Sequence, residues 1–112
     1  MAKRECICPA DAALELISGR WKVPILWELF RGTRRFSELR RLLGGGCGQK
    51  VLTQQLREME RDGLVRRKIY AQVPPKVEYS LTPAGKSLKP VVDAMVKWSA
   101  AKRRVRSEAV KR

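Results

Sequence analysis

Residues 49–62 read QKVLTQQLREMERD, and Gly63 and the sequence LVRRKIY follow them directly. The stretch contains neither proline nor glycine and is rich in Leu, Gln, Arg, Glu and Met. It therefore predicts a helix of roughly four turns that ends at Gly63. At about 100° per residue the apolar side chains form one narrow stripe, which consists of Leu52, Leu56 and Met59. The opposite, outward face consists of Lys50, Thr53, Gln54, Arg57 and Arg61.

The outward face of this helix carries cations and hydrogen-bond donors but no carboxylate, because Glu58 and Glu60 fall on its two shoulders. Lys and Arg hold phosphates or reach guanine, glutamine pairs with adenine through two hydrogen bonds, and threonine offers a methyl group to thymine. A helix that enters the major groove of DNA needs this mixture. The alternative is an ordinary solvated helix face, and the flanking segments decide between the two.

The segment before the helix predicts a helix-turn-helix. SELRRLL at residues 37–43 predicts a short helix capped by Ser37, and GGGCG at 44–48 predicts a tight turn. Residues 37–62 therefore form helix, turn and helix, with the basic face on the second helix.

The segment after Gly63 changes to the period of a β-strand. Two strands are predicted, one over 64–70 from Leu64, Val65, Ile69 and Tyr70, and one over 77–81, where apolar and polar residues alternate. The sequence AQVPPK between them predicts a hairpin tip, because its two prolines cannot continue a ladder of hydrogen bonds. A hairpin directly after a recognition helix is the wing of a winged helix.

Three further helices complete a fold that is mainly α with a small antiparallel β-hairpin (α+β). The first is capped by Asp11 and ends near Ser18, and the second covers about 21–30. The last helix begins after Thr82 and reaches at least Ala101. Its apolar stripe is longer than so small a core needs, which indicates a protein partner. The stripe consists of Leu88, Val91, Val92, Met95 and Trp98.

The 112-residue chain is long enough for one hydrophobic core and too short for two. We expect a basic arm over 1–9, a winged helix-turn-helix domain for DNA binding and dimerisation over 10–101, and a basic tail over 102–112. Lys and Arg number 25 against 11 acidic residues, and this net charge of +14 indicates an anionic partner. The tail either keeps the protein in solution or adds a contact with DNA.

Several classes of function lack the residues that they need. The chain has no histidine and no glycine-rich phosphate loop, so we expect neither an enzyme nor a cofactor. No long apolar run predicts a membrane segment, and the first residues lack the apolar core of a signal peptide. We therefore expect a cytoplasmic protein whose first candidate partner is nucleic acid.

Seven short motifs together resemble the HxlR-type transcriptional regulators. They are CP at 8–9, SGRWK at 18–22, RFSELRRLL at 35–43, QKVLTQQLRE at 49–58, DGLV at 62–65, VPPKVEYSLT at 73–82 and GKSL at 85–88. The resemblance implies a winged helix-turn-helix homodimer, joined through its first and last helices, that binds a double-stranded operator of two-fold symmetry. The turn GGGCG differs from the Pro-Gly-Ile-Ser-like turn that the family usually has.

The three cysteines, Cys6, Cys8 and Cys47, have three alternative interpretations. They are inert thiols, or they form a soft metal site, or one of them senses oxidants or electrophiles. Cations near Cys8 favour its thiolate, and the resemblance implies that the cysteine of the Cys-Pro motif is the sensor in some members. Cys47 is the competing sensor, because it lies in the turn before the recognition helix. A metal site lacks a fourth protein ligand.

These observations predict a sequence-specific DNA-binding regulator with four groups of site residues. The expected base contacts are Lys50, Thr53, Gln54 and Arg57. The expected backbone contacts are Gln49, Arg34, Arg35, Arg40, Arg61, Lys68 and Lys76, with the wing at 72–76 on the neighbouring backbone or minor groove. The expected dimer interface consists of Leu14, Ile17, Leu88, Val91, Val92, Met95 and Trp98. The candidate sensors of a small electrophile or oxidant are Cys8 and Cys47.

A non-specific packaging protein or an RNA-binding winged helix is the alternative function. Either would explain the charge of +14. Neither would need the outward-facing pair of Thr53 and Gln54 or the long apolar stripe of the last helix.

Overall fold

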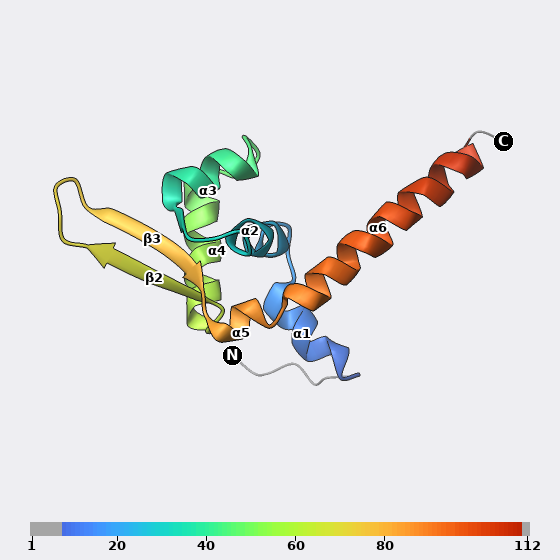
Figure 1. The fold of residues 1–112 in the computed structure, drawn as a ribbon, viewed down its shortest axis with the longest axis horizontal. Helices are drawn as coiled ribbons and strands as arrows, with labels where there is room; N and C mark the ends of the chain where they lie inside the picture. Colours follow the sequence, from blue (N-terminus) through green and yellow to red (C-terminus); the bar gives the residue numbers. More distant parts are fainter. Residues whose placement is uncertain (1–7, 111–112) are drawn as a thin grey trace.

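The computed structural model describes residues 8–110, which form helices around a small antiparallel sheet (Figure 1). The elements in order are α1 (Ala10–Ile17), α2 (Lys22–Leu29), β1 (Arg34–Arg35), α3 (Phe36–Leu43), α4 (Gln49–Arg61), β2 (Val65–Tyr70), β3 (Lys76–Leu81), α5 (Pro83–Lys86) and α6 (Lys89–Val110). The prediction of a mainly α fold with a β-hairpin is confirmed. The short strand β1 adds a third strand, which pairs with β3.

The apolar stripe of α4 is the centre of the core. Leu52, Leu56 and Met59 are all fully buried, as the helical period predicted. They belong to one cluster with apolar residues of α2, α3, the sheet and α6. The cluster includes Ile25, Leu26, Leu39, Val65, Leu81 and Val92. The position of α4 is therefore set by most of the other elements.

Both ends of α4 lie where the sequence predicted them. The helix begins at Gln49 after Gly48, which provides no side-chain cap. At the other end Gly63 has a φ of +79°, and the Leu64 N–H donates to the Met59 carbonyl at 2.9 Å. A left-handed glycine with this reverse hydrogen bond ends a helix and turns the chain away from its axis. The turn directs the chain into strand β2.

The hairpin β2–β3 extends away from the helices (Figure 1). Its register pairs Val65 with Leu81 and Tyr70 with Lys76. Val65 and Leu81 are buried at the base of the hairpin, whereas Val73 at the tip is fully exposed. The hairpin therefore has an anchored base and a free tip, as a wing requires.

Two predicted helix caps were each wrong by two residues, because Pro9 and Arg35 occupy the cap positions of α1 and α3. Asp11 is not the cap of α1, because its N–H already donates to the Cys8 carbonyl at 3.0 Å and α1 begins at Ala10. Ser37 is not the cap of α3. Arg35 occupies that position, since its pairing with β3 keeps it extended, and its N–H donates to the Glu38 carboxylate at 3.0 Å.

The predicted last helix, from Thr82 to Ala101, is two helices. Thr82 does cap α5, accepting from the Gly85 N–H at 3.1 Å, but α5 ends at Lys86. The Leu88 N–H then donates to the Gly85 carbonyl at 3.2 Å, and α6 begins at Lys89. Pro90 is the reason, because it has no N–H to bond with a preceding turn. Beyond the break, α6 continues through Val110.

We expect the substitution Gly85→Ala to destabilise the protein, although alanine ordinarily stabilises a helix relative to glycine. A Cβ at Gly85 would lie 2.2 Å from the Leu64 carbonyl oxygen, which is backbone and cannot swing aside. The cost should be about 1–3 kcal/mol, which lowers the melting temperature by several degrees. Thermal denaturation followed by circular dichroism measures it. Gly45→Ala is the control, because nothing lies within 4 Å of its Cβ; equal melting temperatures for the two variants would contradict the expectation.

Candidate nucleic-acid interface

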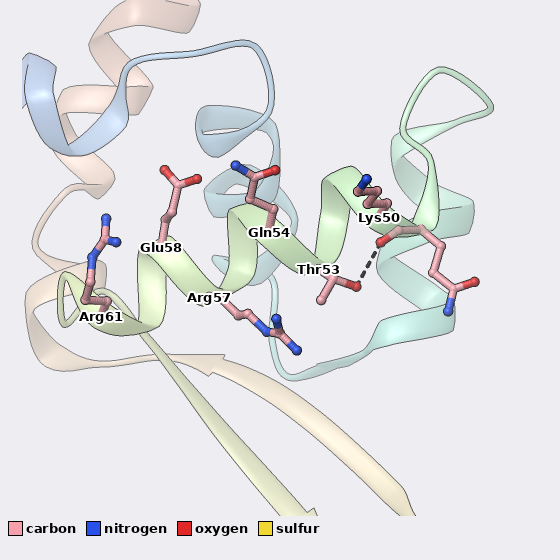
Figure 2. A pocket seen from close by; sticks show the side chains of 7 residues that line it. Lys50, Thr53, Gln54, Arg57, Glu58 and Arg61 are labelled. Atoms are coloured by element: carbon pink, nitrogen blue, oxygen red, sulfur yellow. Dashed lines mark hydrogen bonds between the residues drawn. The ribbon is translucent and has the colours of Figure 1, made fainter.

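The outward face of α4 forms a shallow groove along the helix (Figure 2). The groove contains every outward residue that the sequence singled out, together with one acidic residue. The lining residues are Gln49, Lys50, Thr53, Gln54, Arg57, Glu58 and Arg61. Lys50, Gln54, Arg57 and Arg61 are exposed. This groove offers cations and two amides, those of Gln49 and Gln54, to a ligand that approaches the helix from outside.

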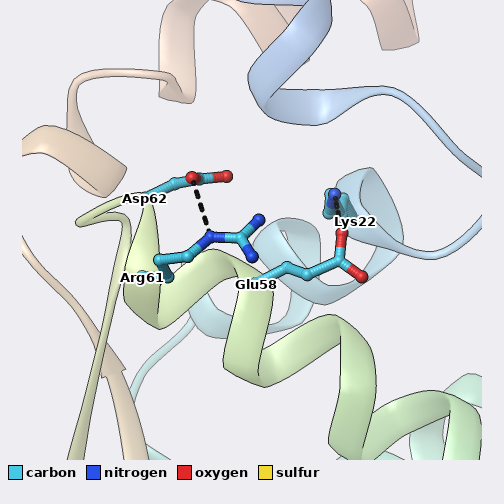
Figure 3. Close-up of polar contacts among 4 residues, drawn as sticks. All are labelled: Lys22, Glu58, Arg61 and Asp62. Carbon is cyan, nitrogen blue, oxygen red and sulfur yellow. Dashed lines mark hydrogen bonds and ion pairs between the residues drawn. The ribbon is translucent and has the colours of Figure 1, made fainter. Parts of the chain in front are cut away.

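Glu58, the carboxylate in this groove, is neutralised from a different element. Lys22 of α2 places its Nζ 2.8 Å from Glu58 Oε1 (Figure 3). The hydrogen bond from Lys22 is the main reason that the pKa of Glu58 lies below its usual value, and burial of the carboxyl opposes it. Glu58 is therefore ionised and paired. The role of Lys22 could not be predicted from the sequence, because its partner lies 36 residues away.

The hydroxyl of Thr53 is partly committed to the helix. Its Oγ1 donates to the Gln49 carbonyl at 2.8 Å (Figure 2). The methyl group and an oxygen lone pair are left for a ligand, so Thr53 suits contact with a thymine methyl or an amino group better than donation to a phosphate.

At the other end of the groove, Arg61 Nε lies 3.8 Å from Asp62 Oδ1 (Figure 3).

A second basic groove lies between α3 and the start of α4. It shares Gln49 with the first groove, so the two form one continuous surface. Arg40 and Arg41 are exposed on its α3 side, and the glycine-rich turn forms its end. Arg40, which the sequence suggested as a phosphate contact, is thus exposed in this second groove.

The wing organises its lysines around one aromatic ring. Lys68 and Lys76 place their Nζ atoms 4.9 and 4.8 Å from the centre of the Tyr70 ring. Lys76 Nζ also lies 3.4 Å from Glu78 Oε2. The hydrogen bond from Tyr70 is the largest cause that lowers the pKa of Glu78. Both predicted wing lysines therefore contact the same ring, and Lys68 is the more exposed of the two.

The arginines of β1 differ from each other. Arg35 is exposed, whereas Arg34 is half-buried and pairs weakly with Glu38 at 3.9 Å. Its Nε is buried and has no hydrogen-bond partner among the described residues. Arg35 is therefore better placed than Arg34 for a phosphate contact.

The two described cysteines occupy opposite environments. Cys8 is exposed just before α1, and Cys47 is only 2% exposed and packs in the core. Burial raises the pKa of the Cys47 thiol, although Arg40 opposes the shift. Within 8–110 no group of three His, Cys, Asp or Glu side chains could hold a metal ion. Cys6 lies outside the described residues, as do Lys3 and Arg4, which are the cations nearest to Cys8 in the sequence.

The apolar surface of the first and last helices divides into two groups. Ile17 and Val92, which were predicted at a dimer interface, are instead buried in the core of the chain itself. Leu14, Val91, Met95 and Trp98 are exposed, with Trp98 at 66%, and Leu88 is half-buried. Val96, which was not predicted at the interface, adds to this surface and is 44% exposed.

No helix within 8–110 is long and apolar enough to span a membrane.

A basic helix on a helix-turn-helix, followed by a wing, defines the class of winged helix-turn-helix proteins. The family model described as HxlR-like helix-turn-helix matches residues 16–107. The chain belongs to this family, which the motifs had predicted. It is an HTH-type transcriptional regulator, and it is not an enzyme.

Relatives and solved structures agree with this assignment. The HTH-type transcriptional regulator YdeP of Bacillus subtilis is 50% identical over 91 residues, which cover 81% of this chain and 70% of the relative. The structure of the redox regulator HypR in its reduced form has a TM-score of 0.84 and 44% identity, and covers 90% of this chain and 99% of that chain. The structure of the regulator YtcD has a TM-score of 0.81 and 47% identity, over 88% and 99% of the two chains. YtcD is also a protein of Bacillus subtilis.

Proposed function

We propose that this regulator is a homodimer that binds an operator of two-fold symmetry, with α4 in the major groove and the wing at 72–76 on the adjacent backbone or minor groove. The observation that carries the proposal is the groove on α4. It presents Lys50, Gln54 and Arg57 outward, and its one carboxylate is paired with Lys22. Such a surface combines phosphate attraction with groups that distinguish bases.

The backbone contacts follow from the grooves and strands beside α4. Arg40 on α3, Arg35 on β1 and Lys68 on the wing are exposed cations that flank the helix. Gln49, which is exposed, and Arg34, Arg61 and Lys76, each of which already has an acidic neighbour, complete the proposed set. Base contacts by Lys50, Thr53, Gln54 and Arg57 would specify sequence, and the cations would fix the register.

The dimer is proposed from the surface of α6. Val91, Met95, Val96 and Trp98 leave 42–66% of their surface exposed on this one helix, and such a cluster of exposed apolar side chains is typical of a protein–protein contact. Helix α6 projects away from the other helices and the sheet along most of its length (Figure 1). A second copy of the chain would cover this surface and place two recognition helices on one face of DNA.

Thiol regulation is proposed at Cys8. Cys8 is exposed, and its carbonyl accepts the first hydrogen bond of α1. HypR, a relative in structure, is a redox regulator. The family resemblance implies that the first helix also lies at the dimer interface, so an adduct or disulfide at the start of α1 would rotate the two recognition helices relative to each other. Moving binding from nearly complete to nearly absent takes about 5.5 kcal/mol between two states, so the rearranged interface has to provide a difference of that size.

Affinity for a selected operator should fall steeply with salt. With about eight phosphates neutralised per dimer, the slope of log affinity against log salt should be about −7. Fluorescence anisotropy with a labelled duplex measures it. Arg40→Ala should make the slope less steep by about one for each subunit and weaken all duplexes alike, whereas Lys97→Ala on α6 should leave the slope unchanged. Equal affinity for the operator and an unrelated duplex would instead favour the packaging function.

Trp98→Glu should convert the dimer to a monomer, because it places a charge in the apolar surface of α6. Sedimentation velocity at micromolar concentration measures the change. Lys97→Glu, at the neighbouring exposed position, is the control and should remain dimeric. A wild-type protein that sediments as a monomer would contradict the proposed dimer.

Diamide should lower the operator affinity of the wild-type protein and leave Cys8→Ser unaffected. Cys47→Ser should respond as the wild type does, since Cys47 is buried and its raised pKa disfavours the thiolate. Loss of the response only in Cys47→Ser would move the sensor to the turn before α4. Unchanged wild-type affinity under diamide would mean that the thiols are inert.

A further inference from the structure

Lys22 is a buried cation that the proposed DNA contacts do not use. Its side chain is 9% exposed, and its ammonium group lies 2.8 Å from the carboxylate of Glu58, whose side chain is 26% exposed. A buried ammonium needs a partner, because its desolvation is otherwise uncompensated. Lys22 is therefore committed to Glu58 and cannot reach a phosphate at the same time.

Glu58 connects this ion pair to the outward face of α4. Gln54 lies one turn earlier on the same helix, at the spacing that brings two side chains together. Figure 2 shows the amide nitrogen of Gln54 on the side that faces Glu58. After the larger effect of Lys22, a hydrogen bond from Gln54 also lowers the pKa of Glu58. The three residues thus form a chain from inside the fold to the outer surface of the helix.

The chemistry of a carboxylate gives this chain a direction. An ionised glutamate only accepts hydrogen bonds, so Gln54 must turn its amide nitrogen, and not its oxygen, toward Glu58. One N–H of the amide is then engaged. The oxygen and the second N–H remain on the outward edge, in a fixed order. An adenine offers the complementary pair, an amino donor and a ring nitrogen acceptor, in the major groove.

We propose that the Lys22–Glu58 pair sets the base preference of α4 by holding the amide of Gln54 in the orientation that reads adenine. Lys22 and Glu58 are positioning residues, because neither needs to touch DNA. The inference rests on the proposed function, since it assumes that α4 enters the major groove. It adds the base that Gln54 reads and the residues that determine that preference.

Glu58→Gln tests the proposal, because glutamine both donates and accepts and no longer fixes its neighbour. Wild-type and variant proteins would each select duplexes from a randomised library, with folding checked by circular dichroism. The wild type should prefer adenine at one position in each half-site. Glu58→Gln should reduce that preference by about tenfold, within the range for a two-hydrogen-bond amide–adenine contact.

Glu60→Gln is the matched control. It lies on the same helix and changes the net charge by the same amount, but Glu60 pairs with Arg67 of β2 at 3.5 Å. The Glu60→Gln variant should prefer adenine as strongly as the wild type does. A loss in both variants would show an effect of charge alone and would overturn the proposal.

The double variant Lys22→Met with Glu58→Gln covers the case in which Glu58→Gln fails to fold. It leaves no unpaired ammonium in the interior, and it should lose the same preference. In a Gln54→Ala background, Glu58→Gln should have no further effect, because the two residues act through one contact.

The outcomes separate this inference from the proposed function. If the wild type selects a sequence and the folded double variant selects the same one with equal discrimination, the role of the pair is refuted while DNA recognition stands. If Gln54→Ala keeps the adenine preference, Gln54 is not the reader and the inference is also refuted. If the wild type selects no sequence, the proposed function and the inference both fail.

Discussion

The burial of one apolar stripe on α4 is the constraint on which the rest of the structure depends. Leu52, Leu56 and Met59 have no exposed surface of consequence, so the opposite side of the same helix must face outward. Fixing one face of a helix in the core therefore fixes the other face on the surface. The left-handed turn at Gly63 then determines where the wing begins. A recognition surface follows from packing, before any contact with a ligand is made.

The carboxylates around this surface are all paired with cations. Four carboxylates lie on α4, at its end or on the wing, and each one has a cationic neighbour. The pairs are Glu58 with Lys22, Glu60 with Arg67, Asp62 with Arg61 and Glu78 with Lys76. Exposed ion pairs contribute little to stability. As a result, no unpaired carboxylate of α4 or the wing opposes a polyanion. Lys50 and Arg40 are exposed and form no ion pair with another residue of 8–110.

Local sequence predicted the elements that local physics determines. The helix over α4, its end at Gly63, the wing and the cap at Thr82 all follow from period and turn chemistry, and each is present. The break before α6 could have been predicted, because Pro90 is visible in the sequence. The shift of the α3 cap could not, since it depends on the pairing of Arg35 with β3. Lys22 was equally hidden, because its partner is 36 residues away and only the fold brings them together.

The central claim is that two copies of α4 read the major groove at two half-sites. Methylation interference on a selected operator tests it most directly, because dimethyl sulfate modifies guanine N7 in the major groove and adenine N3 in the minor groove. The account predicts that guanine N7 methylation blocks binding in two clusters about one helical turn, or roughly 34–36 Å, apart. Interference confined to adenine N3, or a single cluster with no partner, would contradict it.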